Sequence, residues 1–157
     1  MRDFLSDTYP SFDAAPNWRI EQWNWARYHV IPMLGTYRKA QPYVADSLKA
    51  IAVWEGQNAI WETGSGAIVG VVTTENPWPG GAFLQRRPGF DSLLPAMLEH
   101  AEARLADPAK LALMVRVYEH DEPLRRLVEE RGYERDDASV DFDTVFEVGH
   151  GPGPGLP

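Results

Sequence analysis

The clearest pattern of hydrophobic and polar positions is a strand followed by an amphipathic helix between residues 82 and 106. Residues 82–85 form a short apolar run, and the turn Arg86-Arg87-Pro88-Gly89 separates this run from a helical segment. Apolar residues then recur along one helical face, namely Phe90, Leu93, Leu94, Met97, Leu98, Ala101 and Leu105. The pattern predicts a strand that passes through a basic turn into a helix packed on its own sheet. Such a turn favours an anion, because free N–H groups at the start of the helix point towards it.

Two helices are predicted before this unit. Residues 2–9 predict a short helix that Pro10 ends, and residues 18–30 predict a second helix with Asn17 as its N-cap. The second helix is aromatic on two sides, which has two interpretations. It is packed in the core with one side partly exposed, or its aromatic residues, Trp25 and Tyr28 among them, form a wall for a substrate.

The remaining segments predict further strands and one more helix. Residues 34–47 have no clear period and predict a loop, whereas residues 48–54 come close to alternation and predict a strand. Residues 59–62 and 67–74 flank a Gly-rich turn and predict a hairpin. Residues 111–117 predict a buried strand, and a helix follows from the N-cap Asp121 to Gly132. Residues 140–148 alternate apolar and acidic side chains, which predicts a final strand.

This order of elements predicts an α/β (α+β) fold with a mixed central sheet and helices on both faces. At 157 residues the chain is long enough for one domain, which we place at residues 1–148. The segment 149–157 is rich in Gly and Pro and predicts a flexible tail or a linker.

Composition and charge argue against several classes of function. A net charge of −8 argues against nucleic-acid binding, which requires a basic surface. The chain has no cysteine, which excludes thiolate metal sites and cysteine nucleophiles, and its four histidines lack metal-ligand spacing. We therefore expect no metal. No segment resembles a signal peptide or a membrane span, so we expect a cytoplasmic protein without a membrane partner.

Three stretches resemble motifs of the GNAT (GCN5-related) N-acetyltransferase family. GAIVGVV at 66–72 is similar to a hairpin strand of that family, AFLQRRPGF at 82–90 to its fourth strand and acetyl-CoA loop, and LVEERGYE at 127–134 to the segment before its last strand. The resemblance covers roughly residues 1–148 and implies a mostly antiparallel sheet. It also implies transfer of acetyl from acetyl-CoA to a primary amine of a small molecule or peptide. The sequence leaves open whether the protein forms a homodimer.

The resemblance also implies functional residues. The backbone of Phe83, Leu84 and Gln85 would pair with the pantetheine arm where the fourth and fifth strands of the family separate. The coenzyme phosphates would lie at the following turn and helix start, near Arg86, Arg87, Gly89 and Ser92.

Candidates for chemistry lie at the ends of the predicted strands. Glu75 is the first candidate for a general base, ahead of Glu55 and Glu62. Tyr118 and His120, which follow the predicted strand at 111–117, are candidates for an acid or a base. Trp54 and Glu62 join Trp25 and Tyr28 as candidate substrate contacts. Each of these residues has an ordinary structural or solvated role as its alternative.

The chain departs from the family pattern where acetyl-CoA would bind. Asp91 stands at the position of the expected arginine, Ser92-Leu93-Leu94 stands where glycines are expected, and Pro95 has no N–H to offer a phosphate. Val128 stands at the position where the family has the tyrosine that acts as general acid. The stretch at 84–105 is more similar to the degenerate first module of tandem GNAT proteins. The alternative function is therefore a non-catalytic GNAT-like module that binds a ligand or partner. A splayed strand pair beside free N–H groups would favour the enzyme, and a filled turn would favour the module.

Overall fold

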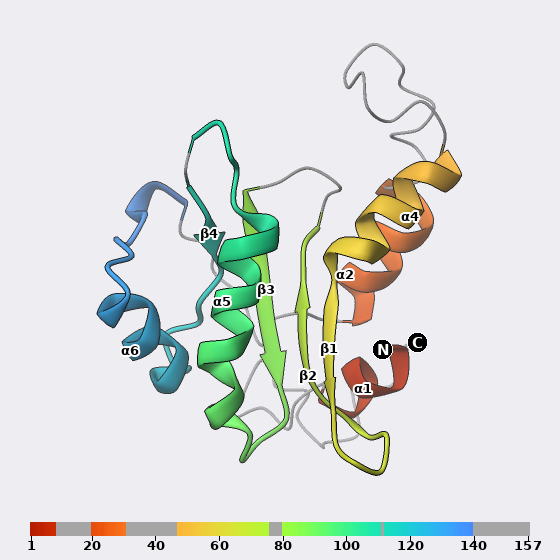
Figure 1. Ribbon diagram of the computed structural model, residues 1–157, viewed down its shortest axis with the longest axis horizontal. Helices are drawn as coiled ribbons and strands as arrows, with labels where there is room; N and C mark the ends of the chain where they lie inside the picture. The colour runs from red at the N-terminus through yellow and green to blue at the C-terminus, as the bar shows by residue number, and fades with distance from the viewer. Residues whose placement is uncertain (9–19, 31–46, 76–79, 111, 140–157) are drawn as a thin grey trace, which may run out of the picture.

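The computed structural model describes residues 1–8, 20–30, 47–75, 80–110 and 112–139. The helical elements, labelled as in Figure 1, are α1 (Arg2–Asp7), α2 (Ile20–Trp25), η1 (Ala26–Val30), α4 (Ser47–Gln57), η2 (Asp91–Leu93), α5 (Leu94–Leu105), α6 (Glu122–Glu130) and η3 (Asp137–Ser139). The strands are β1 (Ala59–Glu62), β2 (Ile68–Thr73), β3 (Gly81–Arg86) and β4 (Met114–Val115). The predicted final strand at 140–148, the tail at 149–157 and almost all of the predicted loop at 34–47 lie outside the described residues.

The strands form one mixed, mostly antiparallel sheet, which confirms the predicted fold class. Their order is β1-β2-β3-β4. The pairs β1–β2 and β2–β3 are antiparallel, and the pair β3–β4 is parallel, with α5 in the connection between its two strands. This parallel pair is short, because Gly81 pairs with Met114 and Ala82 with Val115, while β3 continues to Arg86.

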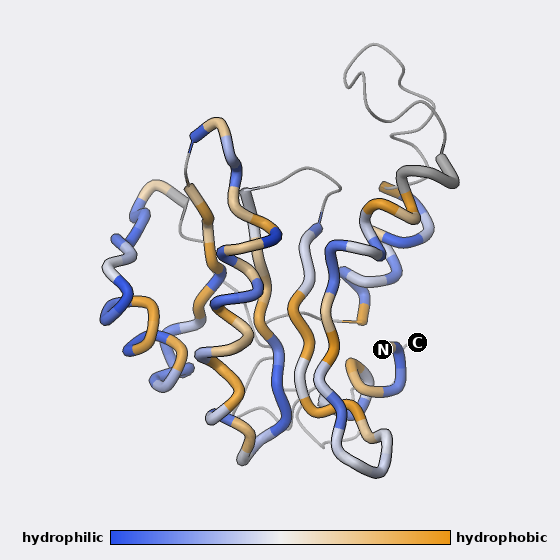
Figure 2. The backbone as a smooth tube through the Cα atoms, viewed as in Figure 1, coloured by the Kyte–Doolittle hydropathy of each residue, from blue (hydrophilic) through white to orange (hydrophobic). Residues whose placement is uncertain are grey.

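Helices cover both faces of the sheet. On one face Val71 and Phe83 pack with α1, η1 and α4 through Phe4, Leu5, Ala26 and Trp54. On the other face Val72, Ala82 and Leu84 pack with α5 and α6. In Figure 1, α5 and α6 lie to the left of the view, and α1, α2 and α4 lie to the right. In the hydropathy colouring of Figure 2, hydrophobic (orange) and hydrophilic (blue) stretches alternate along the helices on both sides of the sheet.

Strand β3 lies between both helical layers, which explains its unbroken apolar run. The four residues from Ala82 to Gln85 are all buried. Alternation along the strand sends Ala82 and Leu84 towards α5 and Phe83 towards α1. A strand that is covered on both faces needs no polar side. The charged end of β3, which leads into the turn before α5, is blue in Figure 2.

Helix α5 buries the face that the sequence pattern predicted. Leu94, Met97, Leu98, Ala101 and Leu105 are at most 2% exposed. Each large apolar side chain buried in this way contributes about 1.5–3 kcal/mol. The helix approaches β2 closely at Gly70, where an added Cβ would lie 3.3 Å from both Leu93 Cδ1 and Met97 Sδ. A larger residue at Gly70 would require the ends of the Leu93 and Met97 side chains to shift by a few tenths of an ångström.

Helix α6 begins and ends as its sequence predicted. The Asp121 side chain caps the helix by accepting from the Leu124 N–H, and Pro123 lies in the first turn, where its missing N–H costs nothing. At the other end Gly132 has φ +84. The Gly132 N–H donates to Glu129 O and the Tyr133 N–H donates to Val128 O, which is the Schellman arrangement.

Two sequence predictions were wrong in their type or extent. Residues 48–54 belong to helix α4 rather than to a strand, because Ile51 and Trp54 pack on the sheet three positions apart while Ala52, at the alternating position, is exposed. The strand predicted at 111–117 covers Met114–Val115, and Met114 is 55% exposed. The short N-terminal helix and the hairpin of β1 and β2 are confirmed. The aromatic helix is confirmed over its described residues, although its second half, η1, is a π-helix.

Candidate functional site

The carboxyl end of β3 is the predicted anion site, and its first arginine is bound by two carboxylates. Arg86 Nη1 and Nη2 donate to the two oxygens of Asp121, at 2.7 and 2.9 Å. Arg86 Nε donates to Asp91 Oδ1 at 2.7 Å, and Nη2 lies 2.6 Å from the same oxygen. Every nitrogen of the guanidinium group therefore contacts a carboxylate of this chain. The ion cluster of Arg86, Asp91 and Asp121 connects the end of β3 with the starts of η2 and α6.

This cluster is partly removed from water. The Arg86 and Asp121 side chains are 12% and 13% exposed, whereas that of Asp91 is 52% exposed. Burial opposes the charged form of Arg86, but hydrogen bonds and charge from Asp121, and then from Asp91, outweigh it and raise the pKa of the guanidinium group. The positive charge at this turn is permanent, and it is neutralised within the molecule.

Arg87 points to the other face of the sheet. Its Nε donates to Ile68 O at 3.0 Å, and its Nη2 donates to Asp7 of α1 at 3.0 Å. Its guanidinium carbon also lies 5.4 Å from the ring centre of Phe4. The residue therefore fastens α1 to the end of the sheet, and the two arginines of the basic turn do not converge on one point.

The turn itself uses several of its own N–H groups. The Phe90 N–H donates to Arg87 O, the Leu93 N–H donates to Phe90 O, and the Leu94 N–H donates to Asp91 O. Gly89 has φ +84, a conformation that favours glycine. Ser92 is exposed within η2. The turn thus contains the predicted glycine and serine, but Asp91 brings a carboxylate to the place where a phosphate was expected.

The parallel strands β3 and β4 lie beside the turn, and their described pairing is short. The Arg116 N–H donates to Ala82 O, and the described pairing of β3 with β4 ends there. Beyond that point Phe83 and Gln85 pair with β2 on the other edge of the strand. The Arg116 guanidinium lies 5.8 Å from the centre of the Phe83 ring. The described pairing of the parallel strands thus lies at the start of β3, at Gly81 and Ala82.

The two candidate catalytic residues lie at different levels of the sheet. Thr73 pairs with Phe83 of the antiparallel strand, so Glu75 lies near the level of Gly81, where β3 begins. Tyr118 follows β4, which runs parallel to β3 and therefore opposite to β2, so Glu75 and Tyr118 follow strands that end at opposite ends of the sheet. The fold does not bring Glu75 and Tyr118 to one reacting centre. Tyr118 instead stacks on His120, with ring centres 5.5 Å apart.

The candidate substrate contacts are spread over three places. Trp54 is fully buried and its indole N–H donates to Thr74 O, which is a structural role. Trp25 and Tyr28 are exposed by 55% and 64% on α2 and η1. Glu62 is exposed at the end of β1. Trp54 therefore lies beside the segment that leads to Glu75, but apart from the turn at Arg86.

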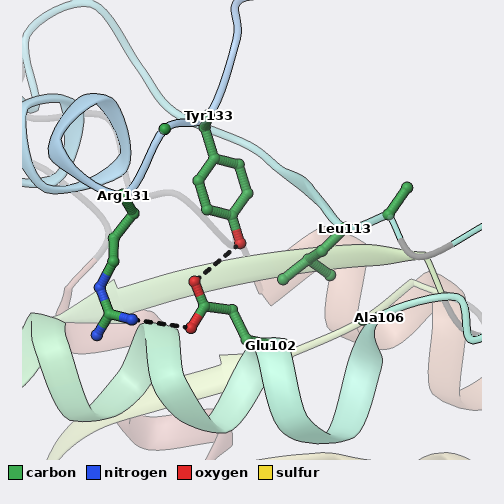
Figure 3. Close-up of a pocket in the computed structure, with 7 residues that line it drawn as sticks. Glu102, Ala106, Leu113, Arg131 and Tyr133 are labelled. Carbon is green, nitrogen blue, oxygen red and sulfur yellow. Dashed lines mark hydrogen bonds and ion pairs between the residues drawn. The ribbon is translucent and has the colours of Figure 1, made fainter.

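A second group of polar side chains, which sequence reasoning did not single out, lines a hollow of about 400 Å³ between α5, the start of β4 and the end of α6. Glu102 lies at its centre and contacts both Arg131 and Tyr133 (Figure 3). Gly132 correctly predicted the end of α6 from the sequence. No sequence pattern indicated that its neighbours, Arg131 and Tyr133, would contact Glu102.

Further comparisons add no named relative. Comparison of the chain with models of protein families, with curated proteins and with solved structures finds no match. Within the described ranges, no three His, Cys, Asp or Glu side chains are grouped so that they could hold a metal ion. None of the described helices combines the length and the apolar character needed to cross a lipid bilayer.

Proposed function

We propose that this domain is a non-catalytic GNAT-like module that binds a ligand or a partner and does not use acetyl-CoA. The observation that carries the proposal is the ion cluster at the end of β3, in which both Asp91 and Asp121 contact Arg86. Each of the three guanidinium nitrogens already contacts a carboxylate, and these contacts use most of the five N–H donors that could bind a pyrophosphate. Two carboxylates at the same place would also repel that group. At a few ångströms and an effective dielectric of about 20, each like-charge contact costs on the order of 4 kcal/mol.

The position of the other arginine supports the same proposal. Arg87 lies on the opposite face of the sheet and contacts Asp7. The N–H groups of Phe90, Leu93 and Leu94 are used within the turn. A phosphate that used these three N–H groups would have to displace their present contacts.

One observation favours the second candidate, a GNAT-like N-acetyltransferase that moves acetyl from acetyl-CoA to a primary amine. The parallel strands β3 and β4 pair at Gly81 and Ala82 and no further among the described residues. A gap between such strands is where the family resemblance would seat the pantetheine arm of the coenzyme.

Calorimetry with CoA and with acetyl-CoA separates the two candidates. The module predicts no heat of binding at millimolar coenzyme, which corresponds to less than about 4 kcal/mol of binding free energy. A thiol-release assay with a panel of primary amines should likewise show no turnover.

The enzyme predicts saturable binding and thiol release, both reduced by the double substitution Arg86→Ala with Arg87→Ala. The matched control is Arg104→Ala with Lys110→Ala, which removes the same charge at the other end of α5, where both side chains are exposed. Turnover that the first pair abolishes and the control pair preserves would overturn the module.

A further inference from the structure

The hollow beside α5 has one charged side and one apolar side. Glu102, Arg131 and Tyr133 form the charged side, and the opposite wall consists of Ala106, Ala112 and Leu113. Glu102 lies in the last turn of α5, and Ala106 is the C-cap residue that follows the helix. A volume of about 400 Å³ lies towards the small end of the range for ligand sites, about 300–1,000 Å³. The hollow therefore suits one small molecule with a polar head and an apolar body.

The end of α6 fixes the two side chains that face Glu102. The Schellman arrangement turns the chain at Gly132, so Arg131 and Tyr133, on either side of this glycine, both point at the carboxylate of Glu102. Figure 3 shows the phenol and the guanidinium group approaching the two oxygens of Glu102 from α6. The geometry comes from the backbone, and it does not require a ligand to form.

The contacts at Glu102 are long for charged groups. Arg131 Nη1 lies 3.3 Å from Glu102 Oε2, and Tyr133 Oη lies 3.4 Å from Glu102 Oε1. Charge-assisted hydrogen bonds are normally about 2.7–2.9 Å long. Arg131 and Glu102 are also 43% and 31% exposed, so water already reaches the pair. An incoming polar group can replace these contacts at little cost.

A ligand with a single charge would satisfy only half of this pair. A cation that binds Glu102 leaves Arg131 without a carboxylate, and an anion that binds Arg131 leaves Glu102 without a cation. A ligand that carries both charges on neighbouring atoms pairs with both. Burial and the nearby Glu102 carboxylate raise the pKa of Tyr133 to about 12, so its phenol stays a hydrogen-bond donor at neutral pH.

We propose that the hollow lined by Glu102, Arg131 and Tyr133 binds a free amino acid with an apolar side chain. The ammonium group of the ligand donates to Glu102, and its carboxylate accepts from Arg131. Its side chain lies against Ala106, Ala112 and Leu113. This site is independent of the proposed function, since it uses no residue of the turn at Arg86.

Amide chemical-shift titration with L-leucine tests this site in the full chain. We expect saturable shifts, centred on the amides of Leu113, Gly132 and Tyr133, with a dissociation constant in the millimolar range. Isocaproate lacks the ammonium group and isoamylamine lacks the carboxylate, so each should bind at least about tenfold more weakly, which is about 1.4 kcal/mol. Equal binding of either analogue, or no saturable shift with leucine, would overturn the proposal without any variant.

Two substitutions test which charged group of the ligand Glu102 and Arg131 each bind. Glu102→Gln and Arg131→Gln should each weaken leucine binding about tenfold or more. Glu102→Gln should in addition reduce the difference between leucine and isocaproate, because it removes the partner of the ammonium group. Glu99→Gln, an exposed change one turn earlier on α5, is the matched control and should bind as the original chain does. Circular dichroism checks that each variant is folded, and unchanged leucine binding in folded Glu102→Gln would contradict the assignment.

Discussion

The end of β3 and the hollow beside α5 both hold an arginine that contacts carboxylates of other elements, but they differ in how tightly the charges are bound. At the end of β3, Arg86 and Asp121 are 12% and 13% exposed, and their contacts are 2.7 and 2.9 Å long. In the hollow, Arg131 and Glu102 are 43% and 31% exposed, and their contact is 3.3 Å long. An arginine–carboxylate pair thus occurs in two forms: a closed pair, Arg86 with Asp121, which is mostly buried, and an open pair, Arg131 with Glu102, which is partly exposed.

The difference indicates what each pair does. A pair that is desolvated and fully hydrogen-bonded cannot lose one partner cheaply, so it serves to hold elements together. Arg86 joins the end of β3 and the start of η2 to Asp121, the N-cap of α6, which lies 35 residues further along the chain. A pair that is exposed and loosely bound contributes little to stability, and its groups stay available to a ligand. Sequence motifs drew attention to the closed pair, whereas the open pair has the properties of a binding site.

The largest effect should come from Arg86→Met, which keeps an apolar stem but removes the charge. Asp121 then keeps its negative charge in a mostly buried place with no cation, and we expect a loss of about 3 kcal/mol in the free energy of unfolding. Urea denaturation measures this loss. Arg104→Met on the exposed side of α5 is the matched control and should leave the midpoint unchanged. Equal midpoints for the two variants would mean that the ion cluster at the end of β3 does not hold the fold together.

A smaller effect should distinguish the two carboxylates of this cluster. Asp121→Asn keeps a side chain that caps α6 but loses the ion pair, so we expect a loss of about 2 kcal/mol. Asp91→Asn, with a side chain that is 52% exposed, should cost less than about 1 kcal/mol.

A double-mutant cycle with Arg86→Met isolates the two couplings. The coupling to Asp121 should exceed the coupling to Asp91. The reverse order would contradict the assignment of Asp121 as the main partner of Arg86.

Local patterns predicted much of the fold. The apolar face of α5, the hairpin of β1 and β2, the N-cap at Asp121 and the end of α6 near Gly132 all depend on neighbours within a few residues. The error at residues 48–54 has a tertiary cause. Leu, Ile, Val and Trp occur in both strands and helices, so the sequence alone did not distinguish the two. Ile51 and Trp54, three positions apart, pack in the same core cluster, and this packing requires a helix. The strand at 111–117 was predicted too long because apolar residues there do not all face the core.

The position of the candidate site was predictable from the sequence, but the pairing of its arginine with carboxylates was not. The sequence located a basic turn between a strand and a helix, and the structure has one. It could not show that Asp121, 35 residues from Arg86 along the chain, fills the space opposite this arginine. It gave no signal for the meeting of Glu102 with Arg131 and Tyr133 either, since these contacts span about 30 residues. Both outcomes depend on long-range packing, which neither periodicity nor motifs contain.

The smallest effect concerns Tyr133 and appears only at alkaline pH. An unfolded tyrosine ionises with a pKa near 10. In the folded chain, burial and the Glu102 carboxylate raise the pKa of Tyr133 to about 12. The neutral phenol therefore favours the folded state fully below about pH 10, and this contribution is lost as the pH rises from about 10 through 12. Tyr133→Phe should lose less stability than the original chain over that range, as measured by urea denaturation at a series of pH values. Tyr28→Phe on η1, where the tyrosine is exposed, is the matched control. Identical pH dependence in the two variants would show that burial and Glu102 do not raise the pKa of this phenol, and would contradict the contact with Glu102 by which Tyr133 distinguishes the hollow from the closed ion cluster at Arg86.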